Sequence, residues 1–208
     1  MANQITHVAL AEKKYDSLFS KFGKEDFFIG TVFPDIRYLG VIDRERTHNT
    51  NFLLPAILDG ENTAFQAGVK YHCLVDAVRE KFIIEQGLYA LVPQSKYITQ
   101  AIKCLEDEIY YPKVSDWAVY VAMLHKTLPE ETAYGVASDD IARWHNLLAD
   151  YFRKTPDDIS REGLMMSIGF PKTVADEINT LVRQMRESGP VVGIIAQFWN
   201  NFDALLNE

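Results

Sequence analysis

The stretch from residue 61 to residue 86, ENTAFQAGVKYHCLVDAVREKFIIEQ, predicts a long amphipathic helix on which the rest of the fold is built. It contains no proline and one glycine, Gly68, and either Asn62 or Thr63 can cap its N-terminus. Large apolar side chains recur at helical spacing, at Tyr71, Val75, Val78 and Phe82. We therefore expect one face of this helix to be buried in the core.

His72 and Asp76 lie four residues apart on this helix, so their side chains point the same way, one turn apart. An imidazole and a carboxylate placed in this way can chelate one metal ion. The same spacing also suits a plain hydrogen bond at a helix surface, and both interpretations stay open. Gly68 favours the first, because a glycine inside a helix costs about 1 kcal/mol relative to alanine and leaves room for another backbone or a ligand.

The composition indicates a globular protein with a substantial core and an acidic surface. The chain has 208 residues, 48% of them apolar, which fits one domain. A formal net charge of -8 disfavours binding of duplex nucleic acid but allows a small phosphorylated substrate held by metal ions. No apolar run reaches the length of a transmembrane segment and no signal peptide is visible, so we expect a cytoplasmic protein. Cys73 and Cys104 are expected to be buried thiols.

Further helices are predicted on both sides of the central one. Apolar spacing and capping residues place them at 3–22, 24–35, 94–110, 114–127, 139–153, 156–168, 172–187 and 190–206. Residues 36–62 carry no long periodicity and predict a polar, loop-rich excursion, a kind of segment that is often functional. Residues 106–108, Glu-Asp-Glu, are expected to form a solvated acidic face.

The predicted fold class is all-α, because no alternating strand pattern of convincing length occurs. We expect a multi-helix single domain over residues 1–208. It would comprise a metal-binding half of about 1–86 and a helical shell of about 87–208.

Side chains that suit a metal ion gather in the first 76 residues. His7 lies in the first turn of the first predicted helix, Asp35 follows a proline at the end of a buried apolar run, and His48 is the only histidine of the loop-rich segment. Taken alone, each also has a structural interpretation as a helix cap or a partly exposed side chain. Together with His72 and Asp76 they offer the nitrogen and oxygen ligands that suit zinc.

In their order, these residues resemble the zinc-dependent phospholipases C of bacteria and the related secreted zinc nucleases of fungi and plants. The matching pieces, spread over about the first 85 residues, are Ile5-Thr6-His7, the GTVFPD segment at 30–35, His48, and Phe65-x-x-Gly68-x-x-x-His72-x-x-x-Asp76. The resemblance implies an all-α fold of that type, here in a cytosolic divergent member. It also implies that Asp35, His48, His72 and Asp76 hold one zinc ion and that His7 and Asp76 hold a second, with Asp76 as the bridge.

The chain departs from the family pattern at the third zinc site. The family has a His soon after the His-x-x-x-Asp motif, where this chain has Phe82. It also has a His-x-x-x-Glu/Asp pair further on, whereas His125 and His145 are followed by Pro129 and Ala149. We therefore expect one or two zinc ions, an absent or rebuilt third site, and structural roles for His125 and His145.

A second departure lies at the N-terminus. The family completes the second zinc with the amine and carbonyl of a mature chain that begins with Trp. The sequence starts with Met-Ala-Asn-Gln and not with Trp, and we expect no cleaved leader. Removal of Met1 would leave Ala2 five residues before His7, which makes its amine the corresponding candidate.

The function predicted on these grounds is that of a metal-dependent hydrolase of phosphoric esters. A water between two zinc ions can attack phosphorus while the metals neutralise the phosphoryl oxygens. The resemblance suggests Asp35 as the catalytic residue that both ligates and accepts a proton. Cations near in sequence are candidates for binding the anionic group, with solvated surface cations as the other interpretation: Arg37, Arg44, Arg46 and Lys70.

One other function is compatible with the sequence, and a third is disfavoured by it. The chain can be a non-catalytic helical binding or scaffold protein that retains a remnant metal site, which the missing third site favours. A nucleotide phosphohydrolase of the His-Asp type would need an adjacent His-Asp pair, and no His in this chain is followed by Asp.

Overall fold

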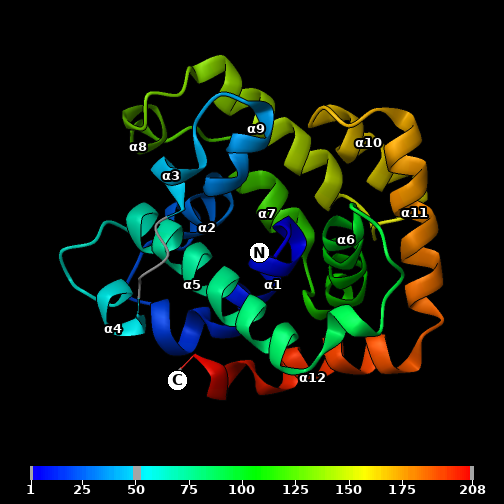
Figure 1. Cartoon of the computed structure of the whole chain (residues 1–208). Helices are drawn as coiled ribbons and strands as arrows, with labels where there is room; N and C mark the ends of the chain where they lie inside the picture. The colour runs from blue at the N-terminus through cyan, green and yellow to red at the C-terminus, as the bar shows by residue number, and fades with distance from the viewer. Residues whose placement is uncertain (1, 49–52, 207–208) are drawn as a thin grey trace.

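Helix α5 (Ala64–Glu85) crosses the middle of the molecule, within the stretch that predicts it (Figure 1). The computed structural model describes residues 2–48 and 53–206. Of the two candidate caps, Thr63 is the one used: its side chain accepts a hydrogen bond from the Gln66 amide at 3.2 Å, and the Gln66 side chain accepts one from the Thr63 amide at 3.0 Å. This reciprocal capping box fixes where α5 begins.

Over these residues the fold is all-helical and contains no strand, which confirms the predicted class. The helices before α5 are α1 (Gln4–Lys14), a π-helical turn (Tyr15–Phe19), α2 (Lys24–Val32), the 3-10 helix η2 (Phe33–Leu39), α3 (Arg44–Thr47) and α4 (Leu54–Ile57). Those after it are η3 (Leu88–Ala90), α6 (Ile98–Tyr110), η4 (Tyr111–Lys113), α7 (Trp117–Met123), α8 (Pro129–Ala133), α9 (Ser138–Phe152), α10 (Asp158–Ser167), α11 (Lys172–Arg186) and α12 (Gly189–Leu205).

The first two predicted helices are shorter than expected. The α-helix expected over 3–22 ends at Lys14 and continues as the π-helical turn. The helix expected over 24–35 ends at Val32, because Pro34 has no backbone N–H with which to continue the hydrogen-bond ladder. The chain then tightens into η2, which carries Asp35. The loop-rich segment is interrupted by α3 and α4.

Two glycines allow α2 and α5 to pack backbone against backbone. A Cβ atom on Gly30 would lie 2.2 Å from the Phe65 carbonyl oxygen, and one on Gly68 would lie 2.1 Å from the Phe27 carbonyl oxygen. Neither position has room for a side chain. Gly68 therefore serves the close approach of a second helix, and this approach brings the end of α2 next to His72.

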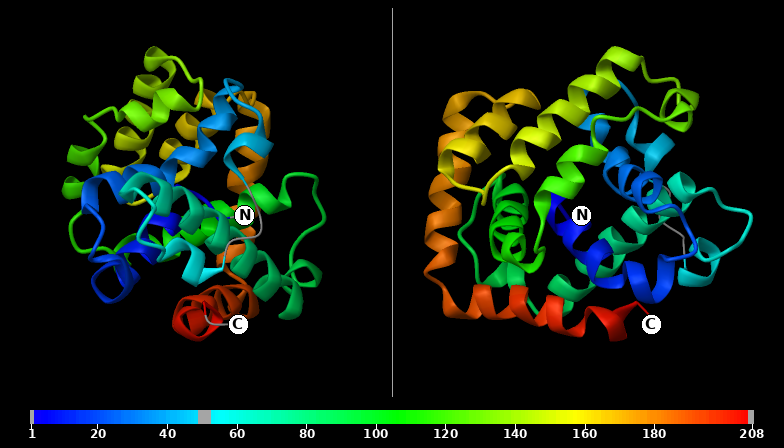
Figure 2. Two further views of the ribbon diagram at one scale, coloured as in Figure 1. Left: turned by 90° about the vertical axis from the view of Figure 1, so that its left-hand side faces the viewer. Right: turned by 180° about the vertical axis from the view of Figure 1, so that it is seen from behind.

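The start of α1 lies in the interior, near the middle of the molecule in every view (Figure 2). Asp107 of α6 holds it there, because its carboxylate accepts hydrogen bonds from Asn3 Nδ2 at 2.7 Å, from the Thr6 amide at 2.8 Å and from Thr6 Oγ1 at 2.9 Å. Tyr151 of α9 donates a further bond at 3.2 Å. These bonds set the position of His7, the next residue of α1.

The prediction of a solvated acidic face at 106–108 is wrong for two of the three residues. Glu106 and Asp107 are 1% and 0% exposed. Each is buried with its own partners: Asp107 binds the start of α1, and Glu106 accepts from Arg79 Nε of α5 at 2.8 and 3.0 Å. Buried carboxylates are tolerated when they are paired in this way.

Cys73 and Cys104 are buried thiols that are not disulfide-bonded, as predicted. Among the helices that the structure describes, none is long and apolar enough to cross a membrane.

Candidate metal centre

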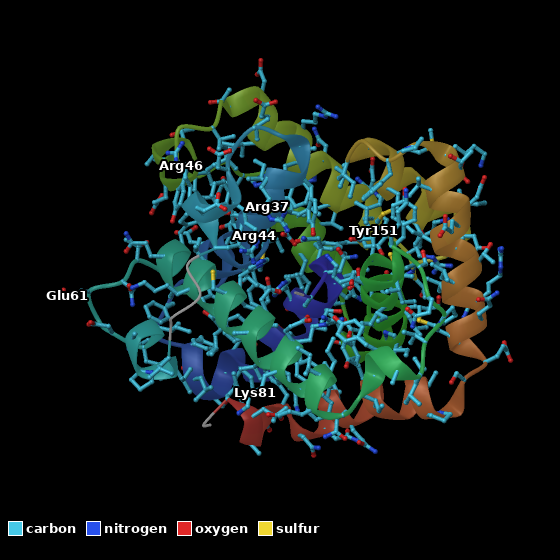
Figure 3. All side chains as sticks on the ribbon, in the orientation of Figure 1. Arg37, Arg44, Arg46, Glu61, Lys81 and Tyr151 are labelled. Atoms are coloured by element: carbon cyan, nitrogen blue, oxygen red, sulfur yellow. The ribbon has the colours of Figure 1, made fainter. Side chains whose placement is uncertain are left out.

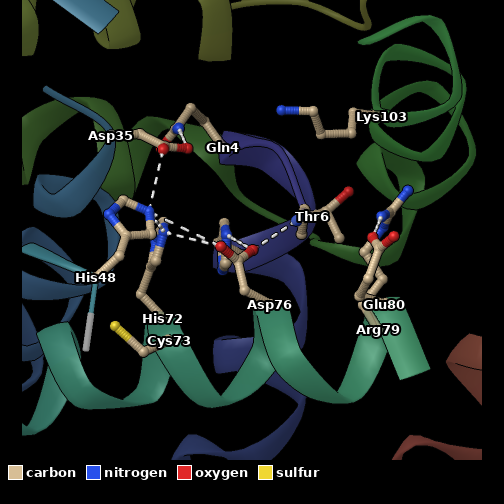
Figure 4. Close-up of polar contacts among 12 residues, drawn as sticks. Gln4, Thr6, Asp35, His48, His72, Cys73, Asp76, Arg79, Glu80 and Lys103 are labelled. Atoms are coloured by element: carbon tan, nitrogen blue, oxygen red, sulfur yellow. Dashed lines mark hydrogen bonds and ion pairs between the residues drawn. The ribbon is translucent and has the colours of Figure 1, made fainter. Parts of the chain in front are cut away.

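The five predicted ligands come together beside α5. Figure 4 labels four of them, Asp35, His48, His72 and Asp76. They come from separate elements: His7 from α1, Asp35 from η2, His48 from the residue after α3, and His72 and Asp76 from α5. All five are buried, and the most exposed of them retains 7% of its surface. Residues up to 69 positions apart in the chain thus converge on one point in the interior.

The first group of ligand atoms comprises His7, His72 and Asp76, whose donor atoms lie within 4.8 Å of one another. His7 Nε2 is 3.2 Å from Asp76 Oδ1, and His72 Nε2 is 3.7 Å from Asp76 Oδ2. The two imidazole rings stack with their centroids 3.7 Å apart and their planes 14° from parallel.

The second group comprises Asp35, His48 and His72. His48 Nε2 is 3.5 Å from Asp35 Oδ1 and 3.2 Å from His72 Nε2. Asp76 Oδ2 lies 3.8 Å from His48 Nε2, so this carboxylate faces both groups. Ligand atoms of a tetrahedral zinc site, about 2.0–2.1 Å from the ion, lie about 3.3 Å apart, and the separations in both groups are close to this value.

Several buried atoms at this point have no hydrogen-bond partner among the residues described. They are His7 Nε2, Asp35 Oδ1 and Asp76 Oδ2. Each buried polar atom without a hydrogen-bond partner destabilises the folded state by about 1–3 kcal/mol. A cation bound between these atoms would satisfy all three, so the residues present fit a metal ion.

The orientation of His72 also suits metal binding. Its Nδ1 lies 2.9 Å from the Thr31 carbonyl oxygen at the end of α2. Because a carbonyl only accepts, Nδ1 carries the proton and the Nε2 lone pair of the neutral ring faces the centre. Thr47 Oγ1 lies 2.9 Å from His48 Nδ1 and holds that ring in the same manner.

Burial and nearby charges put four of the five side chains, His48, His72, Asp35 and Asp76, in their ligating protonation states. Burial lowers the pKa of His72 to about 4 and lowers that of His48, so both rings are neutral at pH 7. Burial alone would raise the pKa of Asp35 and Asp76. The pKa of each carboxyl is nevertheless lowered, for Asp35 by contact with His48 and by nearby cations and for Asp76 by His72 and His7.

A second layer of contacts holds the carboxylates. Gln4 Nε2 donates to Asp35 Oδ2 at 2.6 Å, and an Arg37 guanidinium nitrogen lies 3.4 Å from Asp35 Oδ1. The backbone nitrogen of Ala2, which the sequence indicates as a candidate amine ligand, donates to Asp76 Oδ1 at 2.6 Å. Such outer contacts fix the direction in which a ligand oxygen points.

A cleft of about 350 Å³ opens beside the centre. His48 and Asp76 line it together with Arg44, Glu80 and Thr99. Two of the five candidate ligands therefore reach a space that a small molecule can enter.

The four cations considered for substrate binding lie in different places, and Arg37 is the one beside Asp35. Arg44 lines the cleft. Arg46 donates to the Tyr134 carbonyl oxygen after α8 and lies apart from Arg37 and Arg44 (Figure 3). Lys70 donates to Asn62 Oδ1. Of the four, Arg44 is the one that lines the cleft.

One cation near the centre was not predicted. Lys103 of α6 is 2% exposed and reaches across toward Asp35 (Figure 4). Its Nζ donates to Tyr38 Oη at 2.9 Å.

The residues considered for a third zinc site, Phe82, His125 and His145, lie in three different environments. Phe82 is a core residue whose ring packs on Phe198 at a centroid distance of 5.4 Å. His145 Nε2 lies 2.8 Å from Glu131 Oε1, and both are buried. His125 is exposed.

Comparison of the chain with family models, with curated proteins and with solved structures finds no match in any of the three. The resemblance to the zinc-dependent phospholipases C therefore depends on the four segments that carry it.

Proposed function

We propose that the protein is a metal-dependent hydrolase of phosphoric esters that uses one or two zinc ions. The observation that carries the proposal is the convergence of His7, Asp35, His48, His72 and Asp76 in two adjoining groups, in which three buried ligand atoms lack a hydrogen bond. The neutral imidazoles of His48 and His72 and the ionised carboxylates of Asp35 and Asp76 belong to the donor set that zinc prefers. Asp76 would bridge two ions, because its two oxygens face the two groups.

A bound zinc ion would supply a water of lowered pKa and neutralise charge on the phosphoryl oxygens. The chain's own residues would do the rest. Asp35 accepts the proton of the attacking water at Oδ1, while Gln4 and Arg37 keep the carboxylate in place. Arg44, in the wall of the cleft, binds a phosphoryl oxygen of a small phosphorylated substrate.

Metal content tests the proposal first. Protein purified without added metal is expected to contain one or two zinc ions per chain by elemental analysis. His72→Ala and Asp76→Ala are expected to lose zinc, whereas His125→Ala, a change at an exposed histidine, keeps it. Hydrolysis of p-nitrophenyl phosphate and of bis(p-nitrophenyl) phosphate by the zinc-loaded protein then tests the reaction. Undiminished zinc in both His72→Ala and Asp76→Ala would overturn the assignment.

A second candidate is a helical binding protein with a remnant metal site. The observation that favours it is Phe82, a core residue at a place where the family has a zinc ligand. Bound zinc with no hydrolysis of either ester would support this second candidate.

A further inference from the structure

Lys103 is buried without an acidic partner of its own. Its side chain is 2% exposed. Tyr38 Oη, a neutral group, accepts its hydrogen bond at 2.9 Å, and within residues 2–48 and 53–206 no carboxylate oxygen lies within 4.0 Å of its Nζ. An ammonium carries three N–H donors, and burying it without a counter-ion is unfavourable. Asp35 and Asp76 offset its charge from a longer distance, and a bound anion would add the direct ionic contact that these two carboxylates do not make.

The surroundings of Lys103 place such an anion at the candidate metal centre. The negative charges of Asp35 and Asp76, the two carboxylates of the centre, attract the Lys103 ammonium. Tyr38, which accepts its hydrogen bond, also stacks under Arg37, with the guanidinium carbon 4.2 Å from the ring centroid. Arg37 in turn lies 3.4 Å from Asp35. Two cations thus share one aromatic support beside the same carboxylate.

The cleft borders α6, the helix that carries Lys103. Thr99, which lines the cleft, precedes Lys103 by one turn on α6, so both lie on the same side of that helix. Arg44 and Glu80, which both line the cleft, carry opposite charges. If the centre holds one zinc ion, Asp35 and Asp76 would balance its charge, and Lys103 and Arg37, which also pairs with Asp35, would add two positive charges beside it.

We propose that Lys103 and Arg37 form an anion subsite, supported by Tyr38, that binds the terminal phosphoryl group of a phosphate monoester. This inference rests on the proposed hydrolase function and narrows its substrate class. A monoester is a dianion near neutral pH and matches two positive charges, whereas a diester carries one negative charge. A charged hydrogen bond in a buried site is worth enough to change affinity by about tenfold or more.

Binding of inorganic phosphate, measured by calorimetry on zinc-loaded protein, tests the subsite apart from the reaction. Lys103→Met keeps the length of the side chain and removes its charge, and we expect it to weaken phosphate binding about tenfold or more with zinc content unchanged. Lys96→Met, at an exposed lysine just before α6, is the matched control and should bind phosphate as the unaltered chain does. Arg37→Gln provides a second variant should Lys103→Met fail to fold, with the same expected direction.

The ester preference gives the second readout. Lys103→Met should lower kcat/KM for p-nitrophenyl phosphate about tenfold more than for bis(p-nitrophenyl) phosphate. Equal phosphate affinity in Lys103→Met, Arg37→Gln and the unaltered chain would overturn the subsite. It would also be overturned if Lys103→Met left the ratio of kcat/KM values for the two esters unchanged. A protein that hydrolyses neither ester but binds phosphate through Lys103 would contradict the proposed function and leave the subsite supported.

Discussion

His72 Nδ1 lies 2.9 Å from the carbonyl oxygen of Thr31, so the end of α2 fixes the ring that α5 carries. The contact exists because α2 and α5 approach each other closely at Gly30 and Gly68. The contact fixes the tautomer of His72, because the Thr31 carbonyl only accepts and so requires a proton on Nδ1. The unprotonated Nε2 then faces Asp76 and His48. The packing of two helices thus determines which nitrogen of His72 is offered to a metal.

Gly68→Ala should therefore damage both the fold and the centre. A Cβ atom 2.1 Å from the Phe27 carbonyl oxygen forces the two helices apart. We expect the free energy of unfolding to fall by about 3 kcal/mol in urea denaturation, together with a loss of zinc. Gly163→Ala in α10 is the matched control, because nothing lies within 4 Å of the added atom. It should raise the free energy of unfolding by about 0.5–1 kcal/mol. Equal effects of the two changes would contradict the packing described for Gly68.

The metal-free protein should lose stability as the pH falls through the acid range. Burial lowers the pKa of His72 to about 4, whereas an unfolded chain has a histidine pKa of about 6.5. Between these values the unfolded chain binds more protons at this residue than the folded protein does. The stability contributed by neutral His72 is therefore complete above about pH 6.5 and decreases toward pH 4, by up to about 1.4 kcal/mol per pH unit.

Comparison with His72→Gln isolates this effect. Between about pH 7 and about pH 5 the unaltered metal-free chain should lose about 2 kcal/mol more unfolding free energy than the variant does. Saturating zinc should reduce the loss, because a metal binds the neutral ring. An equal loss in both chains would show that His72 is not buried in its neutral form.

Asp107→Asn should weaken metal binding from a distance. Asp107 accepts bonds from both Asn3 and Thr6 and so places His7. An amide replaces one acceptor oxygen by a donor, so we expect a loss of about 2 kcal/mol of stability and about a tenfold weaker zinc affinity. Asp150→Asn, at an exposed carboxylate of α9, should change neither by a measurable amount. If Asp107→Asn left the zinc affinity unchanged, the position of the start of α1 would not affect metal binding at the centre.

The sequence indicates those site residues whose arrangement follows from spacing along one helix. It does not indicate those that are buried by contacts between distant segments. His72, Asp76 and Gly68 stand at helical spacing on one stretch, and their shared face follows from that spacing alone. Lys103 and Asp107 stand on a helix whose predicted apolar face excludes them, so they look like solvent-facing residues. They are buried because the start of α1 enters the interior and docks on α6, a long-range contact without a local pattern.

The break of the first helix at Lys14 has a similar origin, since no proline or glycine marks it. The sequence predicts that α2 ends near Pro34 but does not give the exact residue. The helix ends at Val32, two residues before the proline. Positions that depend on how one helix docks on another are therefore the ones that a single sequence leaves open.

Arg44 and Arg46 lie two residues apart on α3 and should differ in function. Arg44 borders the cleft, whereas Arg46 binds the Tyr134 carbonyl oxygen after α8. With zinc-loaded protein and p-nitrophenyl phosphate as substrate, Arg44→Gln should lower kcat/KM about tenfold, because a charged hydrogen bond to the phosphoryl group is lost. Arg46→Gln should leave kcat/KM unchanged and reduce stability by about 0.5–1 kcal/mol through the lost contact. Both variants should keep their zinc, since neither residue is among the five candidate ligands. If Arg46→Gln impairs turnover as much as Arg44→Gln does, the substrate does not enter through the cleft that Arg44 lines.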